Sequence, residues 1–186
     1  MIVAIHQPNF VPWLPFFDKM AAVDVFVILS HCQFEKNGFQ NRFQRNGWNT
    51  MSVGKGLSPI RDKQYVSPKK DWAKIKARNS NSPILSEMDA LICPSLLETN
   101  IAIIRHLAAK LGIKTHIELD FPTDKTSTER LVEICREFHA TKYLAGASGG
   151  NYMDANLFAE SGVEIIAQTV DISRRIPIMD YLCLTE

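Results

Sequence analysis

Short apolar runs alternate with amphipathic segments along much of the chain. Residues 2–5 and 25–29 form continuous apolar runs, which are typical of strands buried on both faces of a parallel sheet. Residues 16–23 supply about two helical turns between them, so the two strands are expected to pair in parallel. The second half continues the alternation, with strands expected at residues 114–119, 142–145 and 163–167 and helices at 127–138 and 154–161. The sequence therefore predicts an α/β fold with a mostly parallel sheet and helices on both faces.

The segment after the second strand has a different texture. Residues 31–66 are rich in Asn, Gln, Gly and Arg with interleaved aromatic side chains, which favours a basic loop or hairpin insertion. Within it, short strands are expected at residues 48–53 and 63–66. Further helices are expected at residues 69–78, from Pro83 onward, at 96–111 and at 177–184, with Gly112 ending the third of them. The apolar stripe of that third helix contains Leu97, Ile101, Ile104, Leu107, Ala108 and Leu111.

Length and composition bound the class of protein. The chain has 186 residues, of which 46% are hydrophobic and 22% are charged, as expected of one globular domain spanning residues 1–186. No apolar run reaches the roughly 18 residues that a membrane span needs, and the N-terminus lacks the features of a signal peptide. A cytoplasmic location without a membrane partner is therefore expected. The four cysteines form no Cys-x-x-Cys pair, which argues against a zinc ribbon and a disulfide scaffold.

Charge is distributed unevenly along the chain. The net charge is +1, but residues 31–79 contain eleven Lys or Arg against three acidic residues, a local net charge of +8. Such asymmetry indicates a face that meets anions, either the phosphates of a small ligand or a nucleic-acid backbone. A basic surface that only contacts solvent is the alternative.

The first candidate cluster follows the first predicted strand. His6, Gln7, Asn9 and Trp13 lie in the loop directly after it, and open parallel sheets bind ligands beyond the carboxyl ends of their strands. Because the unperturbed pKa of histidine is about 6.5, His6 can act as a general acid or base, or donate to a phosphate. The alternative is a histidine that only hydrogen-bonds its own loop.

The second candidate cluster follows the second strand, whose end lies at the same edge of the sheet. His31 is expected there to approach His6, while Lys36, Asn41 and Arg42 offer a compact charge, an amide and a planar guanidinium suited to a phosphate or carboxylate. A solvent-facing basic hairpin is the alternative. Cys32 could act as a nucleophile with His31 or join the two histidines as a metal ligand, but no local motif supports either role. We therefore expect no metal and no cofactor.

The third candidate cluster is a glycine-rich segment between a predicted strand and a predicted helix. It contains Gly146 and Tyr152, and its backbone N–H groups can approach an anion at the start of the helix. The glycine spacing is not Gly-x-Gly-x-x-Gly and no Walker lysine follows. A tight turn before a capped helix is therefore an equal alternative.

Several motifs resemble the WbqC-like protein family over nearly the whole chain. The most specific is the string His6-Gln7-Pro8-Asn9-Phe10-x-Pro12-Trp13-x-x-Phe16-Phe17-x-Lys19. It is followed by Asp24-Val25-Phe26-Val27, Gln33-Phe34-x-Lys36, Gln40-Asn41-Arg42 and Gly47-Trp48, and later by Tyr143-Leu144-x-Gly146, Tyr152-x-Asp154, Leu157-Phe158 and Gly162.

The resemblance implies an activity that composition and spacing do not. It implies transfer of an amino or acyl group onto an activated, nucleotide-linked substrate, in the setting of bacterial surface-polysaccharide (O-antigen) and modified-sugar biosynthesis. A second implied setting is phage DNA, where an amino acid such as glycine displaces pyrophosphate from an activated pyrimidine. Two features depart from the family pattern: Ser30 and His31 stand where relatives tend to carry acidic residues, and the chain ends early, so a distal part of the site is expected to lie outside it.

The leading hypothesis is a transferase whose partner is a small phosphate- or nucleotide-linked molecule. His6, with His31, would supply acid or base catalysis, Lys36 and Arg42 would hold the phosphates, and Gln7, Asn9, Trp13 and Asn41 would contact the substrate. The loop from Gly146 to Tyr152 would close the site. Replacing Arg42 by Ala is then expected to abolish phosphate-dependent binding.

A hypothesis from another class is a non-catalytic nucleic-acid-binding module. In it the basic residues between 36 and 78 would follow a DNA backbone, and Phe34, Phe39, Phe43 or Trp48 would stack on bases. Salt separates the two hypotheses, because backbone binding weakens by orders of magnitude between low and moderate salt whereas a small-ligand pocket responds much less.

Overall fold

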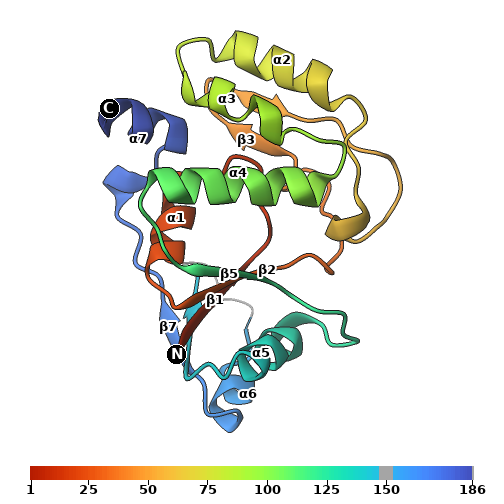
Figure 1. Cartoon of the computed structure of the whole chain (residues 1–186). Coiled ribbons are helices and arrows are strands. Elements are labelled where there is room, and N and C mark those ends of the chain that lie inside the picture. Colours follow the sequence, from red (N-terminus) through yellow and green to blue (C-terminus); the bar gives the residue numbers. More distant parts are fainter. Residues whose placement is uncertain (147–152, 186) are drawn as a thin grey trace.

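The central element of the protein is a five-stranded, fully parallel sheet (Figure 1). The computed structural model describes residues 1–146 and 153–185. The strands are β1 (Ile2–His6), β2 (Val25–Ile28), β5 (His116–Leu119), β6 (Lys142–Ala145) and β7 (Glu164–Ala167), in the spatial order β5-β2-β1-β6-β7. The α/β fold with a parallel sheet, predicted from the alternation of apolar runs and amphipathic segments, is confirmed.

The direction in which successive strands are added to the sheet reverses at its middle. The chain forms β1, adds β2 and β5 on one side of it, and then returns to place β6 and β7 on the other side. This is the arrangement of doubly wound sheets, in which ligands bind where the winding reverses, beyond the carboxyl ends of the strands. In this protein that point lies between β1 and β6.

Helices cover both faces of the sheet, as predicted. Helices α1 (Leu14–Ala21) and α4 (Leu96–Lys110) lie on one face, and α5 (Ser127–Glu137) and α6 (Ala155–Glu160) lie on the other (Figure 1). Successive strand residues point to opposite faces: Ala4 packs in the core with α1 and α4, whereas Val3 and Ile5 pack in the core with α5 and α6. The nearly continuous apolar character of β1 and β2 follows from this burial on both sides.

The insertion after β2 packs on the face that carries α4. It contains an antiparallel hairpin of β3 (Arg42–Gln44) and β4 (Trp48–Thr50), followed by α2 (Pro68–Arg78) and α3 (Ile84–Glu87). Its aromatic side chains extend the hydrophobic core on the α1 and α4 face of the sheet. The ring centroids of Phe43 and Phe10 are 5.8 Å apart there. Phe34 and Phe43 are buried, so the hypothesis that these two side chains stack on nucleic-acid bases is wrong.

Three local expectations differ from the structure. Residues 63–66 form no strand, because the only ladder contacts there are isolated bridges such as Val53 with Tyr65. The expected strand at 48–53 ends at Thr50. Of the predicted apolar stripe, Leu97 and Ile101 of α4 and Leu111 directly after it are only partly buried, because the buried face of the helix is rotated to include the polar Thr99 and Asn100. Gly112, with φ +69, ends this helix as predicted.

The C-terminal segment returns to the start of α1. Residue Trp13 forms an isolated bridge with Pro177, just before α7 (Ile178–Thr185). Within the ranges that the structure describes, no helix has the length and apolar character needed to cross a membrane.

Candidate functional site

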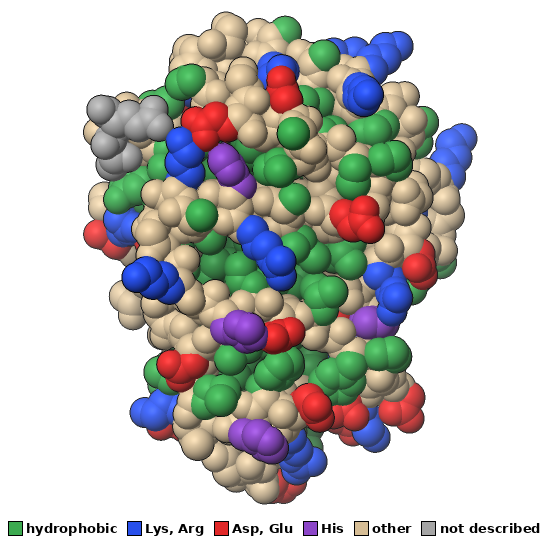
Figure 2. All heavy atoms as spheres, viewed as in Figure 1, with side chains coloured by type: hydrophobic (Ala, Val, Ile, Leu, Met, Phe, Trp, Pro, Cys, Tyr) green, Lys and Arg blue, Asp and Glu red, His purple; other side chains and the backbone are tan. Residues whose placement is uncertain are grey.

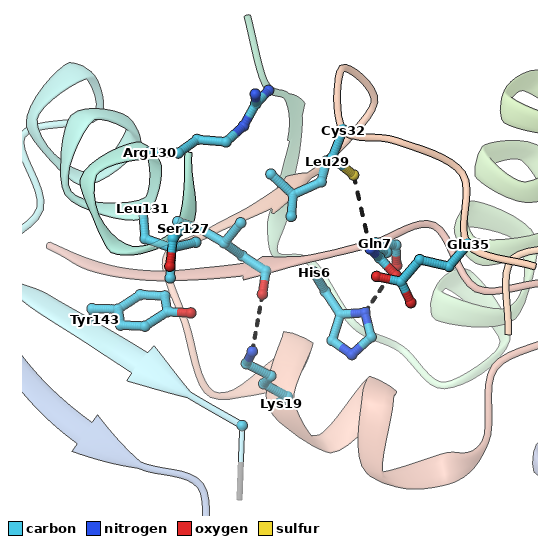
Figure 3. Close-up of a pocket in the computed structure, with 12 residues that line it drawn as sticks. His6, Gln7, Lys19, Leu29, Cys32, Glu35, Ser127, Arg130, Leu131 and Tyr143 are labelled. Carbon is cyan, nitrogen blue, oxygen red and sulfur yellow. Dashed lines mark hydrogen bonds between the residues drawn. The ribbon is translucent and has the colours of Figure 1, made fainter. Parts of the chain in front are cut away.

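A cavity of about 550 Å³ lies at the carboxyl ends of β1, β2 and β6, at the reversal point of the sheet (Figure 3). This volume is within the range of small-molecule sites. The cavity is lined by Ile5, His6, Gln7, Lys19, Leu29, Cys32, Glu35, Ser127, Arg130, Leu131, Tyr143 and Gly146.

The cavity exists because β1 and β6 separate before they end. The two strands pair only through Ile2 and Val3 of β1, so Ile5 and His6 have no partner in β6. Alternate carbonyls of β1 point to opposite neighbours: His6 O accepts from Leu29 N on the β2 side, and Met1 O accepts from Thr141 N on the β6 side. The Ile5 carbonyl therefore points toward β6, where no strand reaches it.

Lys19 fills that gap. Its side chain extends from α1, is 3% exposed, and donates from Nζ to Ile5 O at 3.1 Å. Among the described residues it forms no ion pair with a carboxylate. Burial lowers the pKa of the Lys19 ammonium from 10.5 to about 8, because no negative charge compensates the loss of water. A buried amine with free N–H donors thus lines the cavity.

His6 stands at the end of β1, next to Lys19. Its ring lies edge-on to Phe16, with centroids 4.9 Å apart, and its Nδ1 donates to Gln7 O at 2.9 Å. Since a carbonyl oxygen can only accept, Nδ1 carries the proton and Nε2 carries a lone pair. Burial and the nearby Lys19 charge lower the pKa of His6 from 6.5 to about 4, so the ring is neutral at physiological pH. His6 is therefore a hydrogen-bond and proton acceptor at Nε2.

A buried amide network holds the loop that carries His6 and Gln7. Gln40 Nε2 donates to Gln7 Oε1 at 2.6 Å. Asn100, fully buried on α4, donates to Pro8 O at 2.7 Å and to Gln40 O at 2.6 Å. The Tyr65 hydroxyl completes the network by donating to Asn100 Oδ1 at 2.9 Å. The polar face of α4 thus positions the loop after β1.

The opposite wall of the cavity is the first turn of α5. Ser127, Arg130 and Leu131 line the cavity from this turn, and the residue that precedes it, Thr126, makes no side-chain capping hydrogen bond. The partial positive charge of a helix N-terminus and its free N–H groups favour an anion. Arg130 adds a guanidinium that is ion-paired with Asp120 through Nη2, and its buried Nε has no hydrogen-bond partner within the part of the chain that the structure describes.

Asp120, just after β5, holds Arg130 and His31. Its side chain is fully buried and accepts from Ser30 N and Ser30 Oγ at 2.7 Å each, from His31 Nδ1 at 3.0 Å, and from Arg130 Nη2. Burial alone would raise the pKa of Asp120, but the hydrogen bonds from His31, Ser30 and Arg130 lower it below the usual value. Asp120 is therefore ionised at neutral pH and holds Arg130 at the cavity.

Three of the residues predicted from sequence line the cavity: His6, Gln7 and Gly146. His31 does not line it, and the expected approach to His6 is replaced by contacts of its ring with Asp120 and with Arg61. Tyr152 lies outside the described residues.

The remaining predicted residues lie outside the cavity lining. Trp13 is 45% exposed near Pro177, and Asn41 is buried with its Nδ2 donating to Met51 O at 2.7 Å. Arg42 donates from Nε to Gly38 O at 3.2 Å and stacks on Trp48. Asn9 and Lys36 also lie outside the lining.

Lys19 and Arg130 are cations of the cavity, and neither was predicted as a site residue, although Lys19 ends the most specific family motif. Lys19 was visible as a lone lysine on the apolar face of the first helix, and Arg130 as a basic residue in the first turn of a later helix, where Asp or Glu is usual. Only the packing of α1 and α5 against opposite faces of the sheet reveals that both reach the same cavity.

Cys32 also lines the cavity, but it does not contact His31 in the way a nucleophile and its base would. Its Sγ lies 3.9 Å from Gln7 Nε2, and burial, together with the Asp120 charge, raises the pKa of the thiol. The thiol is therefore protonated at neutral pH. Among the residues that the structure describes, no group of three His, Cys, Asp or Glu side chains is arranged to hold a metal ion.

The geometry defines an α/β protein with a ligand-sized cavity at the reversal point of a doubly wound parallel sheet. By sequence, the chain belongs to the WbqC-like protein family, whose model matches residues 7–175. It is 29% identical over 184 residues to the uncharacterized protein Rv1507c of Mycobacterium tuberculosis, covering 88% of this chain and 80% of that protein. A zinc-bound mutant variant of AdcAII from Streptococcus pneumoniae aligns with 97% of this chain and 94% of its own at 11% identity. The TM-score of 0.25 is too low to indicate a shared fold.

Proposed function

We propose that the protein is a transferase that moves an amino group, supplied by an amino acid or another amine, onto a small activated substrate carrying a phosphate or a nucleotide. The observation that supports this most directly is Arg130, whose buried Nε–H has no hydrogen-bond partner among the described residues and which lines the cavity at the start of α5. Both groups favour an anion at the place where doubly wound sheets bind phosphates. Membership of the WbqC-like family supports the transferase class.

In the proposed reaction the incoming amine attacks the substrate carbon that carries the phosphate. The carbon–oxygen bond breaks, and the phosphate leaves with the bonding electron pair. Arg130 and the first turn of α5 stabilise the charge on this leaving group. The amine loses a proton as the new bond forms, and His6 Nε2 accepts it, because the neutral ring presents a lone pair there. Transfer of an acyl group would use the same phosphate site.

The test is binding of pyrophosphate by calorimetry at low and moderate salt. Wild-type protein is expected to bind it with one site per chain, and Arg130→Gln is expected to weaken binding at least tenfold. Arg136→Gln is the matched control, since Arg136 is an exposed residue in the last turn of the same helix. Equal affinity of wild type and Arg130→Gln would contradict the proposal, provided that thermal unfolding shows both variants to be folded.

A DNA acceptor is the second candidate, and one observation favours it. Phe39 and Trp48 are exposed aromatic side chains with ring centroids 5.8 Å apart, and Arg42 lies over Trp48. Lys and Arg side chains also gather over α2 at the upper end of the molecule (Figure 2). The local charge of +8 overstates this surface, however, because Arg45 and Lys63 are buried. Binding of a single-stranded oligonucleotide that weakens steeply with salt and is reduced by Trp48→Ala would support this candidate.

A further inference from the structure

The most unusual group of the cavity is the amine of Lys19, which the proposed transfer does not require as a reactant. Lys63 is the other buried lysine among the described residues, and it serves as a useful comparison. Lys63 donates to Gly56 O, lies over the Phe34 ring and does not reach the cavity. Lys19, by contrast, donates one hydrogen bond to Ile5 O and lines the cavity (Figure 3).

The surroundings of Lys19 are those of a reactive amine. It projects from a helix packed against the sheet, so the position of its nitrogen is fixed by the core and by the Ile5 carbonyl. No described carboxylate neutralises it, and the neighbouring His6 ring is neutral with an acceptor nitrogen. Lysines that form covalent bonds to carbonyl compounds are typically desolvated in this way, since the neutral amine is the nucleophile.

We propose that Lys19 forms an imine with an aldehyde or ketone that also carries a phosphate. The neutral Lys19 amine attacks the carbonyl carbon, and one of its two protons moves to the carbonyl oxygen to give a carbinolamine. Loss of water then gives the imine, so one C=N bond replaces one C=O bond and no oxidant or reductant is needed. His6 Nε2 accepts the proton that the nitrogen releases and returns it to the leaving hydroxyl. The phosphate would occupy the anion site at Arg130. This placement of the phosphate rests on the proposed function, whereas the imine itself does not.

Burial of Lys19 makes this chemistry effective near neutral pH. With a pKa of about 8 in place of 10.5, the neutral fraction of the amine at pH 7 is about 300 times that of an exposed lysine. Reaction at Lys19 should therefore outpace reaction at the exposed lysines of α2.

The test uses pyridoxal 5′-phosphate as a phosphorylated aldehyde probe. The protein is incubated with the probe, the imine is reduced with borohydride, and the adduct is located by peptide mass spectrometry. One adduct per chain is expected, on Lys19, with a labelling rate at least ten times that of any other lysine. Lys19→Arg, which keeps the charge, should remove this adduct, and Lys70→Arg, at an exposed position of α2, should leave it unchanged.

Two further arms separate this proposal from the transferase proposal. Pyridoxal without the phosphate should label Lys19 more slowly, and Arg130→Gln should slow labelling by the phosphate form but not by pyridoxal. Adducts spread over exposed lysines with Lys19 unmodified would overturn the imine proposal. If pyrophosphate still binds in that case, the anion site survives and Lys19 serves it only as a charge. If pyrophosphate fails to bind while pyridoxal still labels Lys19, the proposed transferase site fails and the reactive lysine remains.

Discussion

Replacing Lys19 by Met is expected to stabilise the fold at neutral pH. The folded protein holds a charged amine away from water without a carboxylate, whereas the unfolded chain solvates it freely. The pKa falls from 10.5 to about 8 on folding, and at 1.36 kcal/mol per unit this corresponds to a cost of about 3.4 kcal/mol below pH 8. Lys19→Met removes this cost, but it also removes the hydrogen bond to Ile5 O, which lowers the gain in stability by about 1 kcal/mol.

The expected net effect of Lys19→Met at pH 7 is therefore about 2 kcal/mol more stability. For a protein of this size that corresponds to a rise in Tm of roughly 4–8 °C. Methionine has a similar length, so the side chain can occupy the same space with little strain. The variant should also lose the imine chemistry of the cavity, a trade of function against stability that is common for strained or desolvated site residues.

The dependence on pH distinguishes this mechanism from simple repacking. Between pH 8 and 10.5 the unfolded chain binds a proton at Lys19 that the folded protein does not, so wild-type stability rises across this window. The advantage of Lys19→Met should shrink by about 1.4 kcal/mol per pH unit there. Urea unfolding of both proteins at pH 7, 8.5 and 9.5 measures this, with Lys70→Met as the exposed control. A Lys19→Met variant that is less stable than wild type, or whose advantage does not change with pH, would refute the reasoning.

Three further predictions concern stability. Because the pKa of His6 falls from 6.5 to about 4 on folding, stability should be fully present above pH 6.5 and decline by up to about 3 kcal/mol as the pH falls to 4; urea titrations of wild type and His6→Gln would show a smaller decline in the variant. Asn100→Ala should lower the free energy of unfolding by about 2–4 kcal/mol, because Pro8 O, Gln40 O and the Tyr65 hydroxyl all lose a buried partner. Chemical denaturation measures this, and a loss below about 1 kcal/mol would contradict the prediction. Gly112→Ala should cost about 1 kcal/mol by the same measurement, since φ there is +69; an unchanged midpoint would show that the turn relaxes.

The strands and most helices could be predicted because their signals are local. The run at 142–145 coincides with β6, and the helix expected at 69–78 begins one residue earlier, at Pro68, which is a favourable first position. The predicted strand at 63–66 was wrong for a non-local reason. Residues Gln64 and Tyr65 are held by single bridges to Ser95 and Val53, and no continuous partner strand runs alongside them.

The candidate site could be predicted only as far as its position at one edge of the sheet. His6 ends β1, and Gln7 and Gly146 directly follow β1 and β6, so the rule that ligands bind at the carboxyl ends of strands was sufficient to find them. Lys19 and Arg130 sit inside helices and reach the cavity only because α1 and α5 pack on opposite faces beside the separating strands β1 and β6. Conversely, the basic hairpin residue Arg42 suited a phosphate by type, but its guanidinium is held by its own loop.

The carboxylate beside the residues that follow β2 is supplied from elsewhere in the fold, by Asp120. Ser30 and His31 stand at that position, and the carboxyl group that they bind comes from the end of β5, ninety residues away in sequence. Because Asp120 accepts from five donors and has a lowered pKa, it is unsuited to carry a proton in a reaction at neutral pH. Its effect is to fix the direction of Arg130 and to keep His31 away from the cavity. His6 and Lys19, by contrast, both line the cavity, and burial has moved their pKa values toward the neutral form, which suits them to accept a proton and to act as a nucleophile.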